Sequence, residues 1–258
     1  MKDVDALIKD LDRADSADSL LNAVKALGEK RSVVAIPHLI QVLNFNNPGA
    51  AVAAVEGLIQ IGVEAVPSLL EQLDRHNYTA RSWAIRALAG IGDPRGLVTL
   101  LGAATADFAV SVRRASARGL GLMKWYWFPS NLREIAQAEA LEALLFVLEQ
   151  DEEWIVRYSA VTGLQGLLQS YAQATDRVEA AWQKILDHDP VPAVRARVAY
   201  ARQNLPRLTP PEPEPMPFPI DWQEILTRLR ERKSLERRTI SDPNNYRDIA
   251  KAIVCQDL

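Results

Sequence analysis

The sequence predicts an all-α protein of the α-solenoid class, in which antiparallel helix pairs of the HEAT or armadillo kind stack into a superhelix. Internal repetition carries this prediction. The segment at residues 35–43 recurs thirty positions later at 65–73, and the segment at 50–62 recurs at 80–92. Repeats of this length, which cannot bury their apolar faces alone, are typical of stacked helix pairs.

Each repeat predicts two helices of different character. The first has a proline in its opening turn (Pro37, Pro67) and then apolar residues at i, i+3, i+4 and i+7, which is the pattern of an amphipathic helix. The second is rich in alanine and glycine, which permits close approach of a neighbouring helix. Gly62 and Gly92 are expected to end their helices with positive φ.

The same pattern extends along most of the chain. Further second helices are expected at 20–28, 112–122, 156–168 and 194–205, which makes about six helix pairs over residues 1–205. Residues 206–219 are predicted to form a proline-rich linker, and 220–258 a helical C-terminal extension. In that extension Asp221 is expected to cap a basic helix from Trp222 to about Arg238, followed by a turn at 242–245 and a last helix at 246–254.

Acidic and arginine residues recur six positions apart where one helix of a pair gives way to the next. Such charge-assisted pairs predict a structural ladder running from repeat to repeat. The pairs are Asp107 with Arg113, Asp151 with Arg157 and Asp189 with Arg195, with Asp74 and Arg81 as a looser example.

Composition excludes several functions. A net charge of −3 and a pI near 5.7 give no field that attracts nucleic acid. The single cysteine, Cys255, excludes an internal disulfide, and the scattered His38, His76 and His188 disfavour a metal site. Without a signal-peptide pattern at 1–18 or an apolar run of membrane-spanning length, we expect a cytoplasmic protein with no membrane insertion.

Four stretches resemble the F-type (beta) subunits of the heterodimeric phycocyanobilin lyases that act on the phycocyanin alpha subunit. Their similarity spans about residues 5–205 and includes inter-helix connectors, which a generic HEAT repeat would not share. The stretches are 46–60, which contains Asn46-Asn47-Pro48-Gly49, and 80–95, 106–115 and 154–161.

The resemblance implies an enzyme subunit. In that family an E-type and an F-type subunit form a heterodimer that binds the bilin and attaches it through a thioether to a cysteine of the acceptor. Phycocyanobilin would then be a substrate, with no permanently bound cofactor. Related heterodimers isomerise the bilin with a Cys and His motif, and the absence of cysteine from residues 1–205 favours ligation alone.

Arginines are the best candidates for binding the two propionates of a bilin, because a guanidinium matches a carboxylate in two-point geometry. Arg86 and Arg118 lie five residues after the ladder arginines and have no acid at a fixed spacing. With Arg114 they are expected to face the concave surface as candidates for bilin or partner binding, with a solvated helix face as the alternative. Tyr158, within the fourth resembling stretch, is a further candidate contact. The sequence does not identify a catalytic acid.

An insertion at 124–131 holds four consecutive aromatics: Trp125, Tyr126, Trp127 and Phe128. They are candidates for a bilin-stacking or subunit-contact loop. The alternative is that they fill the gap that the insertion leaves. For the whole chain, the competing hypothesis to a lyase subunit is a non-catalytic repeat adaptor that binds phycobiliproteins during phycobilisome assembly or degradation.

Overall fold

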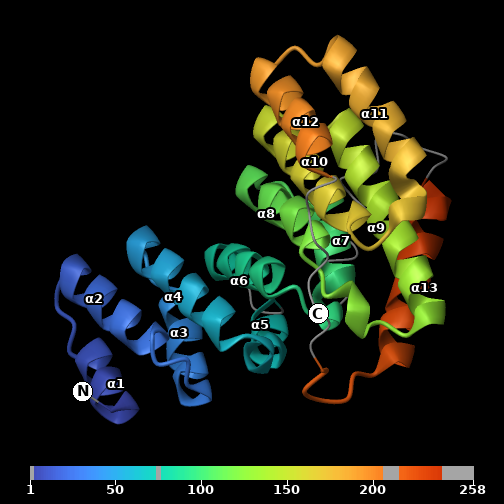
Figure 1. Ribbon diagram of the computed structural model, residues 1–258. Coiled ribbons are helices and arrows are strands. Elements are labelled where there is room, and N and C mark those ends of the chain that lie inside the picture. The colour runs from blue at the N-terminus through green and yellow to red at the C-terminus, as the bar shows by residue number, and fades with distance from the viewer. Residues whose placement is uncertain (1–2, 74–76, 206–214, 240–258) are drawn as a thin grey trace. The chain divides into compact units, whose positions relative to one another are not determined.

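The computed structural model describes residues 3–73, 77–205 and 215–239, and all the regular structure in these ranges is helical (Figure 1). The helices form successive pairs, so the all-α solenoid expected from the repeats is confirmed. We call the first helix of each pair an A helix: α1 (Val4–Asp12), α3 (Ile36–Val42), α5 (Val66–Leu73), α7 (Leu97–Ala106), α9 (Ser130–Gln150) and α11 (Thr175–His188). The second is a B helix: α2 (Ala17–Gly28), α4 (Pro48–Ile61), α6 (Tyr78–Ile91), α8 (Val110–Gly121), α10 (Trp154–Leu168) and α12 (Pro192–Asn204).

The local signals in the sequence act as predicted at the helix ends. Pro37 lies in the first turn of α3, where no intrahelical partner is needed for its nitrogen. Asn47 accepts a hydrogen bond from the Ala50 N–H at 3.0 Å and caps α4, so the Asn46-Asn47-Pro48-Gly49 segment is a turn into that helix. Gly62 and Gly92 follow α4 and α6 with φ of 91° and 70°.

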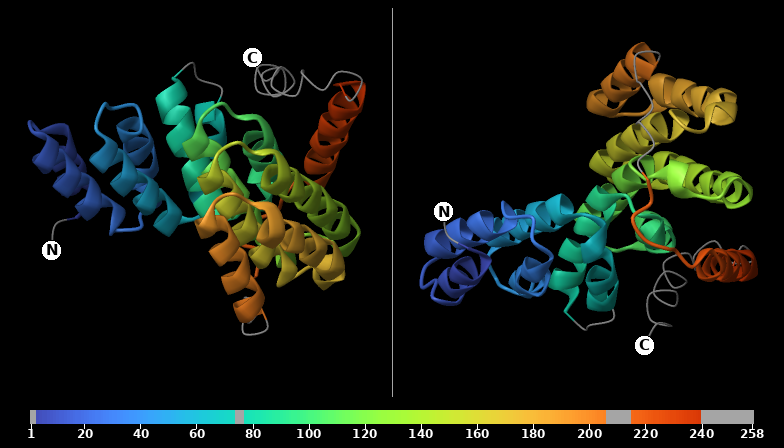
Figure 2. Two further views of the ribbon diagram at one scale, coloured as in Figure 1. Left: turned by 90° about the horizontal axis from the view of Figure 1, so that it is seen from above. Right: turned by 60° about the horizontal axis from the view of Figure 1, so that its bottom comes forward.

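The chain divides into two compact units, Met1–Ile91 and Gly92–Leu258. In the first unit the B helices α2, α4 and α6 pack in succession (Figures 1 and 2). In the second unit α8, α10 and α12 pack in succession along one side, while α7, α9 and α11 lie along the other (Figure 1). Apolar residues between the two layers form the core of the second unit; Leu101, Leu144 and Trp182 are fully buried there.

Glycine permits the tight packing of α8 against α10. A Cβ on Gly163 would lie 2.2 Å from the carbonyl oxygen of Ala117 and 2.8 Å from a methyl group of Leu144. A methyl group at this position must therefore push the two helices apart, because the obstructing carbonyl belongs to rigid backbone.

We expect Gly163→Ala to destabilise the second unit by about 1–3 kcal/mol, the usual cost of overpacking a core. Urea unfolding followed by circular dichroism measures this. Gly102→Ala is the matched control, since nothing lies within 4 Å of the added Cβ in helix α7. There the better helix propensity of alanine should raise stability by about 0.5–1 kcal/mol. Equal effects of the two substitutions would contradict the packing argument.

The C-terminal helix α13 (Trp222–Thr239) packs on the A-helix side of the second unit, against α7 and α9. Asp221 accepts hydrogen bonds from the N–H groups of Gln223 and Glu224, each at 3.0 Å, and so caps the helix as expected. Ile225 and Leu229 are buried, and Glu139 of α9 forms ion pairs with Arg232 and Lys233. The predicted turn at 242–245, the predicted helix at 246–254 and Cys255 lie outside the described residues, as do Asp74 and His76.

Removal of residues 206–258 should leave the helix pairs folded, because repeat stability comes from contacts between neighbours. The Tm should nevertheless fall by about 4–8 °C, the shift expected for a loss of about 2 kcal/mol in a chain of this size, because the truncation exposes the surface that Ile225 and Leu229 cover. Thermal unfolding followed by circular dichroism tests both statements. Loss of a cooperative transition would contradict the first, and an unchanged Tm the second.

Among the described residues no single helix is long and apolar enough to cross a membrane. One bent helix pair, Pro48–Ile61 with Val63–Leu73, passes that test by length and composition alone.

Candidate functional site

Arginines at the start of the B helices join successive repeats of the second unit. Arg113 donates to both carboxylate oxygens of Asp151, at 2.6 and 3.1 Å, and Arg157 does the same to Asp189, at 2.8 and 3.1 Å. The carboxylate thus belongs to the repeat that follows. The acid six residues earlier contributes its backbone carbonyl instead: Arg113 Nη1 reaches Asp107 O at 3.0 Å, and Arg195 Nη1 reaches Asp189 O at 2.5 Å.

This ladder fixes the register of the B helices and shifts the ionisation of its members. The hydrogen bond to Asp151 raises the pKa of Arg113. Burial alone would raise the pKa of Asp189, but hydrogen bonds from Arg157 and from the Val191 N–H outweigh burial and lower it below the usual 3.8. Each step of the ladder is closed by two hydrogen bonds between an arginine and a carboxylate, so we assign these side chains a structural role.

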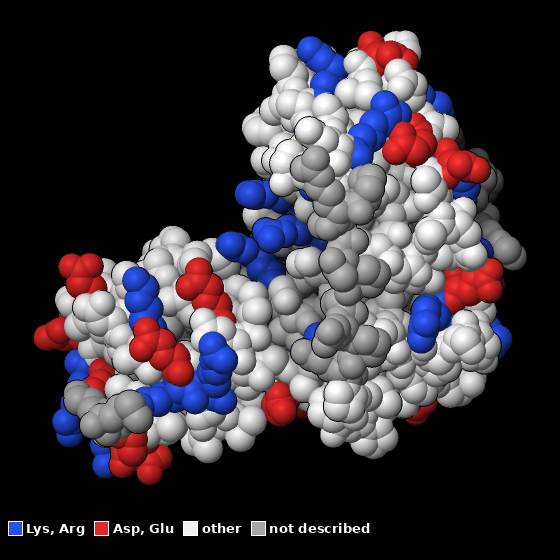
Figure 3. Space-filling model, in the orientation of Figure 1, with Lys and Arg blue, Asp and Glu red and all other residues white. Residues whose placement is uncertain are grey.

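Helices α8, α10 and α12 contain seven arginines and neither aspartate nor glutamate. Four of these arginines have acidic or carbonyl partners: Arg113, Arg157 and Arg195 in the ladder, and Arg202, which pairs with Glu179 at 2.7 Å. The other three, Arg114, Arg118 and Arg197, form no ion pair among the described residues. Figure 3 shows Lys and Arg side chains over α8 without an intervening Asp or Glu.

The ladder arginines occupy equivalent positions on helices α8, α10 and α12, and this register places the candidate residues Arg114, Arg118 and Tyr158 on one face of these helices. We call this face the arginine face. With Arg113 and Arg157 equivalent, Tyr158 on α10 takes the position that the exposed Arg114 has on α8. By the same register Tyr200 on α12 takes the position of the exposed Arg118. Because α8 packs on α10 and α10 on α12, these side chains follow one another across the face. The structure therefore brings together Arg114, Arg118 and Tyr158 of the sequence-predicted set.

Two residues of this face, Arg197 and Tyr200, could not be picked out from the sequence. The Arg197 side chain lies 9% exposed between α10 and α12 and donates to Thr162 Oγ1 at 3.0 Å and Gln165 Oε1 at 2.5 Å. Its guanidinium carbon is 5.8 Å from the ring centre of Tyr158 and 5.2 Å from that of Tyr200. Burial without a carboxylate nearby lowers the pKa of Arg197.

Arg86, the remaining arginine candidate, belongs to the first unit. It lies on α6, where its guanidinium carbon stacks 4.4 Å above the ring of Trp83. The arginine face is made of second-unit residues alone, and Arg86 is not part of it.

Three of the four rings in the aromatic insertion are closed off, which corrects the expectation that Trp125, Trp127 and Phe128 are available to a ligand, whereas Tyr126 is half-buried. Trp125–Trp127 forms a 3-10 turn directly before α9, and Trp125, Trp127 and Phe128 are buried. The C-terminal segment covers them: Phe218 packs edge-on against Trp127 at 6.5 Å between ring centres, and Trp222 against Phe128 at 5.3 Å. The structure thus supports the alternative in which these rings fill space, with the C-terminal segment as their partner.

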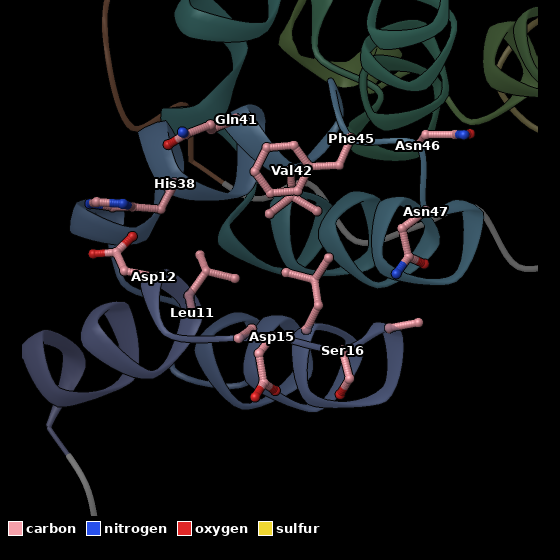
Figure 4. A pocket seen from close by; sticks show the side chains of 13 residues that line it. Leu11, Asp12, Asp15, Ser16, His38, Gln41, Val42, Phe45, Asn46 and Asn47 are labelled. Atoms are coloured by element: carbon pink, nitrogen blue, oxygen red, sulfur yellow. The ribbon is translucent and has the colours of Figure 1, made fainter.

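The first unit holds a cavity of about 550 Å³ between the α1–α2 connection and α3 (Figure 4). Leu11, Val42 and Phe45 supply its apolar lining, while Asp12 and His38 are titratable groups at its edge. Asn47 also borders it, but its side chain is engaged in capping α4. Among the described residues no group of three His, Cys, Asp or Glu side chains is placed to hold a metal ion. No single group here stands out as a catalytic acid.

Comparison with known proteins assigns the architecture to a family. The HEAT repeat family matches residues 36–121 and 66–165. The phycocyanobilin lyase subunit beta of Pseudanabaena tenuis is 52% identical over 270 residues, which cover 96% of each chain. The phycocyanin alpha phycocyanobilin lyase CpcF of Synechocystis sp. is 45% identical over 203 residues, 79% of this chain and 94% of that protein. This chain belongs to the family of phycocyanobilin lyase beta subunits.

A solved structure of the family has the same fold. One chain in the complex of CpcE and CpcF of phycocyanin lyase from Nostoc sp. PCC7120 is 46% identical to this lyase subunit, with a TM-score of 0.62, and the match covers 66% of this chain and 99% of that one. The match to the Pseudanabaena protein spans nearly the whole chain, so it includes the C-terminal extension, for which the resembling stretches offered no counterpart.

Proposed function

We propose that this chain is the beta subunit of a heterodimeric lyase that attaches phycocyanobilin through a thioether to a cysteine of the phycocyanin alpha subunit. Family membership is the observation that carries the proposal, and the solved complex of the related CpcE and CpcF supports an E-type subunit as the partner. Phycocyanobilin is the substrate and not a permanently bound cofactor. We further propose that the enzyme acts in the cytoplasm.

The reaction requires the lyase to orient the bilin and the acceptor cysteine, and it does not require a nucleophile from the lyase. The acceptor thiol adds across the ethylidene double bond of the bilin: the S–H bond breaks, a C–S bond forms, and the proton ends on the bilin. The lyase therefore needs to hold a long apolar pigment with two propionates against the acceptor cysteine, which is catalysis by proximity. Arg114 and Arg118 are exposed, carry no ion-pair partner among the described residues, and supply the cations for such a ligand.

Reconstitution tests this function. Purified E-type subunit, phycocyanobilin and apo-phycocyanin alpha subunit are combined with and without this chain, and covalent product is measured by absorbance after denaturation, which releases unattached pigment. We expect efficient covalent attachment only when both lyase subunits are present. An unchanged yield without this chain would refute the proposal.

A second candidate function is an adaptor in phycobilisome assembly. It is favoured by one relative, the phycobilisome maturation protein of Synechococcus elongatus, which is 45% identical over 199 residues. An adaptor would bind phycocyanin that already carries its pigment and would not change the rate of attachment. Pull-down of pigmented phycocyanin together with the reconstitution distinguishes the two functions.

A further inference from the structure

Arg197 is a buried cation whose hydrogen-bonding capacity is only partly used. Two of its nitrogens donate to the neutral side chains of Thr162 and Gln165. The third, Nη1, is shielded from solvent and has no hydrogen-bond partner. Among the described residues no aspartate or glutamate forms an ion pair with it.

Burial of the Arg197 charge without a counterion lowers the stability of the fold, so we expect this residue to have a function that compensates for the loss. A buried charge without a counterion loses hydration that neutral partners replace only in part. The other part-buried arginines of these helices avoid that cost: Arg113 and Arg157 each bind a carboxylate through two hydrogen bonds. In Arg197 the same Nε and Nη2 edge binds the neutral side chains of Thr162 and Gln165 in place of a carboxylate, and Nη1 has no partner.

We infer that Arg197 is a carboxylate-binding residue of the arginine face and that it receives one propionate of the bilin. The inference rests on the proposed function and names a residue that positions its substrate. Thr162 and Gln165 bind Nε and Nη2 and hold the guanidinium in a fixed orientation, so Nη1 is the donor that remains for a propionate. Tyr200 lies beside the guanidinium and is itself 58% exposed, so the guanidinium lies close to the protein surface, and neighbouring side chains must move for a ligand to reach the buried Nη1.

The surroundings of Arg197 suit a conjugated pigment better than an isolated anion. Tyr158 and Tyr200 place aromatic rings within 6 Å of the guanidinium, where the flat rings of a tetrapyrrole can pack beside the charge. No acid on α8, α10 or α12 repels a carboxylate that approaches this face.

The test compares phycocyanobilin with its dimethyl ester, in which both propionates are neutral. Dissociation constants are measured by absorbance titration of the full-length chain in complex with its E-type subunit. The wild-type complex should prefer the free acid, and Arg197→Gln should reduce that preference about tenfold to a hundredfold, the range for a charged hydrogen-bonded contact. Binding of the ester should not change. Arg197→Lys, which keeps the charge without the fork, should retain part of the preference.

Arg202→Gln is the matched control on the same helix, because Arg202 already binds Glu179 and should leave the acid preference unchanged. Circular dichroism checks that each variant is folded. The inference is overturned if the wild-type complex shows no acid preference, if Arg197→Gln retains it, or if that variant weakens acid and ester equally.

The alternative to a bilin propionate as the ligand of Arg197 is a carboxylate of the partner subunit. In that case Arg197→Gln weakens the heterodimer and leaves the ratio of acid to ester binding unchanged, which also overturns the inference. Covalent attachment is measured separately with the same proteins. Attachment by the wild type with an unaltered ratio in Arg197→Gln refutes this inference alone, whereas absence of attachment by the wild type refutes the proposed function.

Discussion

Asp189→Asn should destabilise the second unit by about 3–5 kcal/mol, the usual cost of removing one partner from a buried ion pair. The Asp189 side chain is 2% exposed and that of Arg157 is 11% exposed, so loss of the carboxylate charge leaves a largely desolvated guanidinium. Asparagine has nearly the same shape and can still accept from the Val191 N–H, which confines the change to charge. Urea unfolding at about pH 7 measures the loss.

The pH dependence of this effect has a definite sign. The folded-state pKa of Asp189 lies below its usual value of 3.8, so its stabilisation is complete above that value and disappears as the pH falls through the folded pKa. The difference in free energy of unfolding between the wild type and Asp189→Asn should therefore become smaller as the pH falls below 3.8. Glu142→Gln is the control, because the exposed Arg177–Glu142 pair should contribute about 0.5 kcal/mol or less. A similar loss in both variants would contradict a structural role for the ladder.

Combined Arg114→Gln and Arg118→Gln should lower kcat/KM for bilin attachment about tenfold to a hundredfold, since each lost charged contact to a carboxylate weakens binding by about that factor or less. Both side chains are exposed and form no ion pair among the described residues, so the substitutions remove charge without breaking a structural contact. Attachment to the phycocyanin alpha subunit is followed by the absorbance of the covalent product, and the circular-dichroism spectrum should not change.

Arg177→Gln is the matched control for this pair. It removes one exposed arginine from the A-helix side, where it binds Glu142, and should leave attachment unaffected. Equal rates for the double variant and the wild type would remove Arg114 and Arg118 from the binding surface.

Much of the fold was predictable because its signals are local. Proline in the first turn, asparagine at the cap and glycine after the B helices each act within a few residues, and the structure follows them at Pro37, Asn47 and Gly62. The repeat-to-repeat ladder was also visible as a spacing. Its true carboxylate partner was not, because Asp151 lies one repeat beyond Arg113 and only the stacking of helix pairs brings them together.

The site was predictable only in part. Arg118 was found because it lacks an acid at fixed spacing, and Arg114 because it lies on the same helix, but the burial of Arg197 depends on the packing of α12 on α10, which no local pattern encodes. One sequence signal would have drawn attention to it: three successive B helices contain arginine and no acid.

The burial of the aromatic insertion was not predictable from the sequence. Its exposure could not be judged without knowing that Phe218 and Trp222, some ninety residues further along the chain, return to cover Trp127 and Phe128. The sequence marked this C-terminal segment as a linker and helix but carried no sign of where it docks.

The most direct test of a bilin site on the arginine face is an experimental structure of the heterodimer with phycocyanobilin bound. We predict that at least one propionate lies within hydrogen-bonding distance of Arg114, Arg118 or Arg197, on the side of the second unit formed by α8, α10 and α12. A pigment whose carboxylates contact only the A helices, or only the other subunit, would contradict a bilin site on this face.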